Sequence, residues 1–144
     1  MIVSQILKSK DNTDIISVKP SDPVFSAVSL LSEKRIGTVV VSADGTSLDG
    51  ILSERDIVRE MGRRGATCLS DTVADMMTAK LVTCTPDDSA DAVLEMMTSG
   101  RFRHLPVMAD GKMIGLISIG DVVKARLAEL SMRQDALQGM IMGH

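Results

Sequence analysis

The sequence predicts a mixed α/β (α+β) fold made of two copies of one strand–helix–strand–strand–helix unit. The first observation is an internal repeat, in which segment 15–20 reappears as 81–86 and segment 50–56 reappears as 115–121. The others are helical spacing of apolar residues and an Asp-Gly turn in each copy. A repeat of this length sets the architecture before local propensity does. Each copy spans roughly 45 to 50 residues, too few to close a core alone, so the two copies are expected to pack together.

The first half of each copy is predicted to be a short helix, an aliphatic strand and a longer helix. The short helices are expected at 3–7 and 73–77, and the strands at 15–18 and 81–84. Capping and acidic residues at 21–23 and 87–89 then predict helix starts. Apolar residues follow at the spacing of one buried helix face. They are Val24, Ala27, Val28 and Leu31 in the first copy, and Ala90, Val93, Leu94 and Met97 in the second.

The second half of each copy is predicted to be a β-hairpin followed by a helix. Asp44-Gly45 separates aliphatic runs at 38–42 and 48–52, and Asp110-Gly111 separates runs at 104–108 and 113–117. An Asp-Gly pair between such runs is a hairpin signal. The helices that follow are expected to begin at Ser53 and Ser118. Their inward-facing residues are predicted to be Ile57, Val58, Met61, Val122 and Val123.

The C-terminal stretch continues the helical pattern as far as Gln138, with Leu127, Leu130 and Leu137 along one side. The apolar end, Met140-Ile141-Met142, fits either a contact with a partner subunit or a frayed helix end. We therefore expect repeat 1 with its lead-in helix at 1–62, a linker at 63–72, repeat 2 at 73–130 and a tail at 131–144.

Composition excludes several classes of function. The 144 residues carry a net charge of −3, so no overall charge draws the chain to nucleic acid or anionic lipid. No apolar run approaches the roughly 20 residues that span a bilayer, and the N-terminus lacks the pattern of a signal peptide. Cys68 and Cys84 are isolated, as expected of reduced cytoplasmic thiols. We predict a cytoplasmic protein that binds neither nucleic acid nor membrane.

The most informative motif is Ser-x-x-Asp, which occurs at Ser53/Asp56 and again at Ser118/Asp121. One interpretation is local, because serine at the N-cap and an acid at N3 form a capping box. The other is a ligand site, since a helix N-terminus after a strand offers amides and a positive dipole end to a phosphate. The serine hydroxyl adds a donor there, while the aspartate would repel phosphate and instead accept from both ribose hydroxyls. The repetition of the motif favours a nucleotide-binding site.

A basic cluster precedes the second hairpin and forms the other candidate element. Arg101, Arg103 and His104 stand there, and the first copy has Lys34, Arg35 and Thr38 at the same place. The arginines fit either a solvent-exposed loop or a clamp for phosphate oxygens. Within the Ser-x-x-Asp motifs, Arg55 adds a cation in the first copy, whereas Gly120 allows close backbone approach in the second.

Catalytic and metal chemistry has little support in the sequence. Cys84 and His104 are the one combination that could supply a nucleophile and a base. No His, Cys or Asp cluster has metal-ligand spacing, and the glycines form neither GxGxxG nor a Walker loop. We expect a non-enzymatic protein that needs no metal to fold.

Taken together, these residues resemble a tandem pair of CBS domains, often called a Bateman module. The resemblance runs from Val3 to about Lys124. It rests on the segments IGTVVV at 36–41, GILSERDIV at 50–58, RHLPV at 103–107 and GLIS at 115–118.

The resemblance implies a pseudo-twofold disc that binds adenosyl ligands, namely AMP, ADP, ATP, NAD(H) or S-adenosylmethionine, between its repeats. It implies ribose contacts at Asp56 and Asp121, and phosphate-side hydroxyls at Ser53 and Ser118. Arg103 and His104 match the basic pair of nucleotide-binding members. The base is expected near Val18, Thr83 and Pro106.

AMP is the first candidate ligand, because the arginines of the second copy favour a phosphorylated compound. The resemblance also implies a homodimer. With no effector domain in the sequence, the expected role is a sensor or regulatory module that changes the arrangement of repeats or subunits and acts on an unknown client protein. The alternative is a constitutive dimerisation scaffold in which Ser-x-x-Asp serves only as a helix cap.

Overall fold

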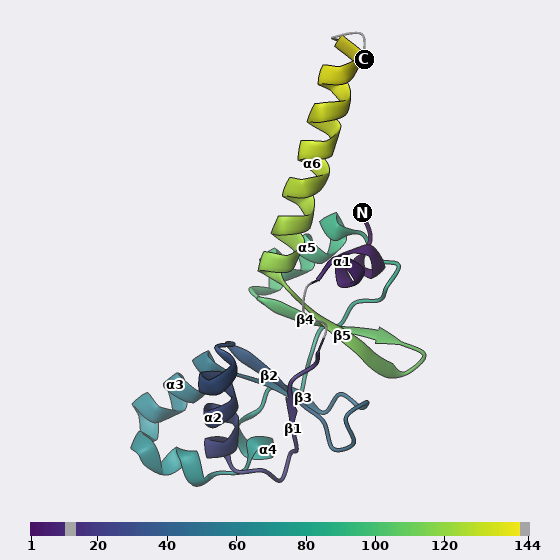
Figure 1. Cartoon of the computed structure of the whole chain (residues 1–144). Coiled ribbons are helices and arrows are strands. Elements are labelled where there is room, and N and C mark those ends of the chain that lie inside the picture. The colour runs from purple at the N-terminus through teal and green to yellow at the C-terminus, as the bar shows by residue number, and fades with distance from the viewer. Residues whose placement is uncertain (11–13, 142–144) are drawn as a thin grey trace. The chain divides into compact units, whose positions relative to one another are not determined.

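The computed structural model describes residues 1–10 and 14–141, which form two compact units (Figure 1). Unit 1 contains Met1–Thr13, Thr83–Met108 and Gly115–His144, and unit 2 contains Asp14–Val82 and Ala109–Ile114. Unit 1 therefore takes its first helix from the N-terminus of the chain. The expected boundaries at 62, 73 and 130 follow the sequence repeats, whereas the compact units exchange their lead-in helices.

Unit 2 is a three-stranded sheet with helices packed on it. Its elements are β1 (Ser17–Val18), α2 (Val24–Lys34), β2 (Thr38–Val41), β3 (Gly50–Ser53), α3 (Glu54–Arg64), the 3-10 helix η1 (Gly65–Ser70) and α4 (Val73–Met76). The strand order is β1-β2-β3, with β1 parallel and β3 antiparallel to β2. All four residues of β2 are buried, as expected for a central strand covered on both faces.

Unit 1 repeats this plan with one strand fewer. Its elements are α1 (Val3–Ser9), α5 (Ala90–Gly100), β4 (His104–Ala109), β5 (Lys112–Ser118) and α6 (Ile119–Ile141). The predicted strand at 81–84 is reduced to one parallel bridge, between Cys84 and Val107. The reason lies in β4: the Val40 N–H donates to Ile16 O in unit 2, but the equivalent residue of unit 1 is Pro106, which has no N–H to give to Val82.

The lead-in helices dock in the same way in both units. In unit 1 the N–H groups of Val3 and Ser4 donate to the carbonyls of Asp88 and Pro86, and in unit 2 those of Val73 and Ala74 donate to Asp22 and Pro20. Val3 and Ile6 are fully buried in the core of unit 1, and Val73 and Met76 are buried in that of unit 2. Each core is therefore completed by a helix that the sequence repeat places in the other half of the chain.

The predicted helices are confirmed, but some of the predicted faces are wrong. The inward stripes of α2 and α5 are buried at Val24, Ala27 and Leu31, and at Ala90, Val93 and Met97. On α3 and α6, Ile57 and Val122 are buried as expected, while Val58, Met61 and Val123 are exposed. Val58 and Met61 lie on an exposed apolar face of α3, and Val123 lies on an exposed face of α6.

The two hairpin turns also differ. Asp110 and Gly111 both have positive φ, which matches the predicted two-residue turn between β4 and β5. In the first copy the connection is longer and β3 begins at Gly50 rather than at residue 48. Asp44 accepts from the N–H groups of Thr46 and Ser47, and Asp49 accepts from that of Ala43. These side chains hold residues 42–49 as a loop.

The C-terminal region is one continuous helix rather than a separate tail. Residues 131–141 prolong α6, and Met140 is exposed. Met142, the end of the predicted apolar tail, lies outside the described residues.

Candidate functional site

The Ser-x-x-Asp motif of unit 1 forms the start of α6. The Asp121 N–H donates to Ser118 Oγ at 3.1 Å, and the Ser118 N–H donates to Asp121 Oδ2 at 2.9 Å. This is the capping box of the local interpretation. The Ser118 and Asp121 side chains are half-buried at the end of β5.

The basic loop of unit 1 is tied to the same helix start. The Ile119 N–H donates to Arg103 O at 2.9 Å, which fixes Arg103 and His104 beside Ser118 and Asp121. Arg101 ends α5 in the left-handed conformation and is exposed, as is Arg103. Their exposure lets both arginines meet an anion from solvent.

Lys10 is the residue of this site that the sequence prediction missed. Its Nζ lies 3.0 Å from Asp121 Oδ2 and 2.8 Å from Leu116 O. Because unit 1 takes its lead-in segment from the N-terminus, Lys10 reaches a helix that begins more than one hundred residues later. The second copy has Lys80 at the equivalent position, seven residues after Val73 as Lys10 is after Val3, but no contact between Lys80 and Asp56 is seen among the described residues.

Charges inside this cluster shift two pKa values. Burial alone would raise the pKa of Asp121, but the Ser118 N–H and the Lys10 ammonium outweigh it, so the pKa lies below its usual value. Burial lowers the pKa of His104, with Lys10 and Arg103 acting in the same direction and Asp121 opposing them. At neutral pH the site therefore holds an ionised aspartate beside a neutral histidine.

The equivalent site of unit 2 is built in the same way, but its aspartate makes more hydrogen bonds within the protein. The Ser53 N–H and Oγ–H donate to Asp56 Oδ2 at 3.0 and 3.1 Å, and the Asp56 N–H donates to Ser53 Oγ at 3.3 Å. The Glu54 N–H donates to Gly37 O at 2.9 Å. Thr38, which is buried, pairs with Ser53 across β2 and β3. The Asp56 carboxylate is itself buried.

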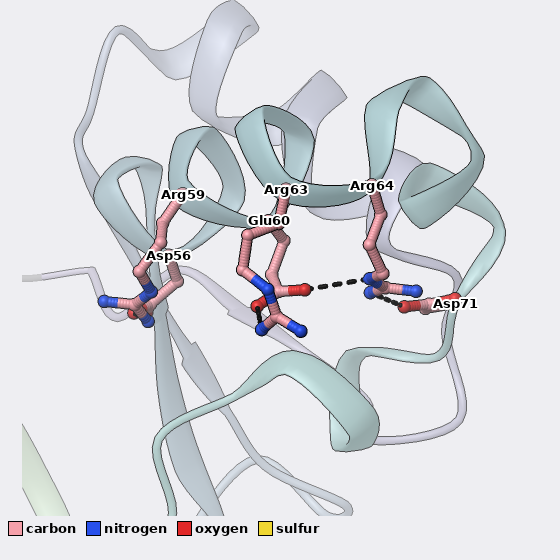
Figure 2. A network of polar contacts seen from close by, with 6 residues as sticks. All are labelled: Asp56, Arg59, Glu60, Arg63, Arg64 and Asp71. Atoms are coloured by element: carbon pink, nitrogen blue, oxygen red, sulfur yellow. Dashed lines mark hydrogen bonds and ion pairs between the residues drawn. The ribbon is translucent and has the colours of Figure 1, made fainter.

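Arg59 occupies the second oxygen of Asp56. Its Nη2 donates to Asp56 Oδ1 at 3.0 Å, and Figure 2 shows the two side chains lying together on α3. Farther along the helix, Glu60 accepts from Arg63 at 3.0 Å and from Arg64 at 2.9 Å, and Arg64 also pairs with Asp71. Spacing of i,i+3 on a helix could have revealed the Asp56–Arg59 pair from the sequence.

Fewer backbone N–H groups are free to bind a phosphate at the starts of α3 and α6 than the sequence predicted. The capping boxes and the carbonyls of Gly37 and Arg103 take most of the N-terminal amides of α3 and α6. Among the described residues, the N–H groups that these contacts leave in the first turn are those of Arg55 and Gly120. A Cβ at Gly120 would lie 3.7 Å from Ser118 Oγ, an ordinary contact, so packing within unit 1 does not require glycine here.

The remaining candidate residues fall into two groups. Lys34, Arg35, Arg55 and Thr83 are exposed. Val18 in β1 and Pro106 in β4 are buried, and Val18 belongs to the core of unit 2. Lys34 and Arg35 end α2 just before β2, which places them on the loop that is tied to the start of α3.

The Cys84–His104 combination does not form a reactive thiol. Burial raises the pKa of Cys84 to about 11, with a further contribution from Asp88, so the thiol stays protonated at neutral pH. Within residues 1–10 and 14–141, no three His, Cys, Asp or Glu side chains group as metal ligands would. The helices of the same residues include none that is both long and apolar enough to cross a bilayer.

Comparison with known proteins identifies this arrangement. The family model described as "CBS domain" matches residues 3–63 and 73–128, which are the two sequence repeats. The chain belongs to the CBS-domain family. A relative from Arabidopsis thaliana, the CBS domain-containing protein CBSX3, mitochondrial, is 35% identical over 98% of this chain and 72% of its own length.

Solved structures of CBS-domain proteins share the fold. The CBS-domain containing protein ATU1752 from Agrobacterium tumefaciens has a TM-score of 0.82 and 39% identity, covering 88% of this chain and 99% of its own. The structure of CBSX2 in complex with AMP has a TM-score of 0.72 and 29% identity, covering 88% and 96%. The predicted fold class and the resemblance to a tandem CBS pair are thereby confirmed.

Proposed function

We propose that this CBS pair is a non-enzymatic regulatory module that binds an adenosyl nucleotide, with AMP as the first candidate, and that the Asp121 site is the stronger of its two sites. The observation that carries the proposal is the state of the two aspartates. Among the described residues, the contacts of Asp121 use Oδ2, whereas both carboxylate oxygens of Asp56 have partners. Asp121 therefore has an oxygen left for a ribose diol.

The charges around Asp121 support a phosphorylated ligand. Arg101 and Arg103 are exposed cations on the loop tied to α6, and the Gly120 amide lies at the positive end of that helix. Lys10 offsets the negative charge of Asp121, which would otherwise repel a phosphate. The complex of CBSX2 with AMP, a protein of the same fold and 29% identity, supports AMP as the first ligand to test.

The regulatory part of the proposal follows from the same site. A ligand shifts a conformational equilibrium only by its differential affinity for the two arrangements. The Asp121 site joins segments from the N-terminus, the loop after α5 and the start of α6, so a ligand bound there couples these segments. We propose that this change is transmitted to a separate client protein and that the module works in the cytoplasm.

The two capping boxes favour one alternative, a scaffold without a nucleotide ligand. They satisfy the local chemistry of Ser-x-x-Asp with no ligand present. The alternative predicts no change in the melting temperature of the protein with any adenosyl compound. The proposal predicts stabilisation by about 2.7 kcal/mol when the ligand is at about 100 times its dissociation constant.

Isothermal titration with AMP and 2′-deoxy-AMP tests the proposal. In the wild-type protein, loss of the 2′-hydroxyl should weaken binding. Asp121→Asn should weaken AMP by about 10- to 100-fold, since a hydrogen bond to a charged group contributes about 1.5–3 kcal/mol. The same variant should bind the two ligands about equally, because it no longer accepts from both hydroxyls.

Asp56→Asn is the matched control and should change AMP affinity much less than Asp121→Asn. The proposal is rejected in favour of the scaffold if the protein binds none of five compounds at millimolar concentration: AMP, ATP, NAD⁺, NADH and S-adenosylmethionine. Tighter binding of S-adenosylmethionine than of AMP would keep the adenosyl site and reject AMP as its ligand.

A further inference from the structure

The two copies place different side chains at the first residue of the strand beside each Ser-x-x-Asp motif. In unit 2 this residue is Thr38, which pairs with Ser53 across β2 and β3. In unit 1 it is His104, which begins β4. Threonine stays uncharged between pH 5 and pH 8, whereas histidine is the side chain whose charge changes there. The repeat therefore gives this position a titratable group in unit 1 and an uncharged one in unit 2.

Backbone geometry holds His104 beside the motif of unit 1. The Ile119 N–H donates to Arg103 O at 2.9 Å, which joins the residue before His104 to the residue after Ser118. Unit 2 has the equivalent bond, which there accompanies the strand pair just described. His104 is half-buried. Its imidazole is therefore part of the site rather than a side chain in bulk solvent.

Charged groups face His104 from three segments of unit 1. Asp121 lies at the start of α6, Lys10 follows α1, and Arg103 precedes His104 on its own loop. Burial disfavours the charged imidazolium, the two cations act in the same direction, and the aspartate opposes them. The Lys10 ammonium lies 3.0 Å from Asp121 Oδ2, so it offsets much of what the carboxylate could do for the imidazolium. This balance keeps the pKa of His104 below its ordinary value.

A phosphate monoester bound at this site reverses the balance. It carries about 1.5 to 2 negative charges at pH 7, and Arg101 and Arg103 are exposed cations that can meet it. A phosphate beside Arg103 neutralises a cation that opposes protonation of His104, and it adds negative charge near the imidazole. Asp121 keeps its own negative charge, because its pKa is lowered. Each of these changes favours the imidazolium over the neutral imidazole.

We propose, resting on the nucleotide-binding function proposed above, that His104 takes up a proton when a phosphorylated nucleotide binds at the Asp121 site, so that acidification strengthens AMP binding. The proton comes from solvent and is held by the imidazole, and no bond of the nucleotide is broken. By linkage, the factor by which protonation tightens AMP equals the factor by which AMP favours protonation. The site thereby responds to two signals, the nucleotide concentration and the pH.

The coupling has a defined sign and range. The affinity for AMP rises as the pH falls through the pKa of His104 in the complex, and it levels off once the free protein is protonated as well. The second pKa of a phosphate monoester is about 6, so protonation of AMP itself opposes the effect in the same range. Comparison with a variant that lacks the imidazole cancels this contribution. Adenosine has no phosphate and should show no coupling.

NMR titration of the histidine side chains tests proton uptake in the wild-type protein. The sequence has two histidines, His104 and His144, so the variant His144→Gln assigns the two signals. Between pH 8 and pH 5, the titration midpoint of His104 should move to higher pH when AMP is saturating. Saturating adenosine should leave the midpoint where it is in the free protein. An unchanged midpoint with saturating AMP would overturn the proposal.

Isothermal titration of the wild type and of His104→Thr at pH 8, 7 and 6 measures the effect on affinity. The substitution introduces the residue that the first copy carries at this position, so the variant should fold. The affinity of the wild type for AMP, relative to that of His104→Thr, should increase about 10-fold from pH 8 to pH 6, since a pKa difference of one corresponds to a factor of ten. The same ratio for adenosine should stay constant.

His144→Gln is the matched control, because it removes the other histidine and should keep the pH dependence of the wild type. A ratio for AMP that does not change with pH, or one that changes equally for AMP and adenosine, contradicts the proposal. AMP binding without proton uptake leaves the nucleotide-binding function standing and removes only the coupling through His104. Absence of AMP binding at every pH removes both.

Discussion

The two Ser-x-x-Asp motifs have the same backbone geometry and opposite surroundings. In unit 2, Asp56 is buried, and its carboxylate is held by Ser53 and Arg59, both within its own helix start. In unit 1, Asp121 is half-buried and its cation, Lys10, comes from the far end of the chain. The contacts of Asp56 support a mainly structural cap in the first copy, and those of Asp121 support the proposed ligand site in the second.

The largest expected difference is in stability. Asp56→Ala should reduce the free energy of unfolding by about 2–3 kcal/mol, since it removes a buried charged acceptor and a capping box. Asp121→Ala should cost about 1–2 kcal/mol, because its side chain is more exposed. Urea unfolding measures both, with the exposed Asp135→Ala on α6 as control. A greater loss for Asp121→Ala than for Asp56→Ala would contradict the structural role assigned to Asp56.

The next difference concerns Lys10, which pairs with Asp121, whereas the described ion pair of Asp56 is with Arg59 and not with Lys80, the repeat equivalent of Lys10. Lys10→Met should weaken AMP by about 5-fold and leave adenosine nearly unchanged, because the lost charge offsets a repulsion that only a phosphorylated ligand experiences. Isothermal titration with the two ligands measures this. Lys8→Met, which alters an exposed lysine of α1, is the control. Equal losses for AMP and adenosine would show that Lys10 acts through the fold alone.

The smallest expected effect is on the pH dependence of the free energy of unfolding. It concerns His104 of the second copy, whose equivalent in the first copy is Thr38. Burial lowers the pKa of His104 in the folded protein, so the unfolded chain takes up this proton first as the pH falls. The histidine therefore removes stability as the pH drops below about 6.5.

His104→Thr makes the second copy like the first and should flatten the loss of stability between pH 7 and pH 5. Urea unfolding at pH 7, 6 and 5 measures the slope, and His144 is present in both proteins. A slope unchanged by the substitution would remove His104 as the cause. A steeper slope would reverse the sign derived from its burial.

The sequence predicted the elements of both units because the repeat and the helical spacing depend on local pattern. It also selected Ser118, Asp121, Arg103 and His104 as candidates, as two separate motifs that the structure joins through the Ile119–Arg103 backbone hydrogen bond. Two features required the tertiary structure. Lys10 reaches Asp121 only because the lead-in helices are exchanged, and no local pattern encodes that exchange.

The second source of error was the assignment of the buried face on α3 and α6. Val58, Met61 and Val123 were expected to point inward because they are apolar and near buried positions. A helix with two apolar stripes does not disclose which stripe its own unit covers. The shortened strand at 81–84 had a visible cause in the sequence, since Pro106 stands where the first copy has Val40.

The exchange of lead-in helices also has a consequence for folding during synthesis. Synthesis proceeds from the N-terminus at about 5–20 residues per second. Helix α1 therefore leaves the ribosome before its core partners in α5, β4 and α6 are made. Until those partners are made, the Val3 and Ile6 side chains have no core to pack against. Residues 14–82, by contrast, already contain nearly all of unit 2. Helix α1 must therefore stay undocked until the segments that complete its core have been synthesised.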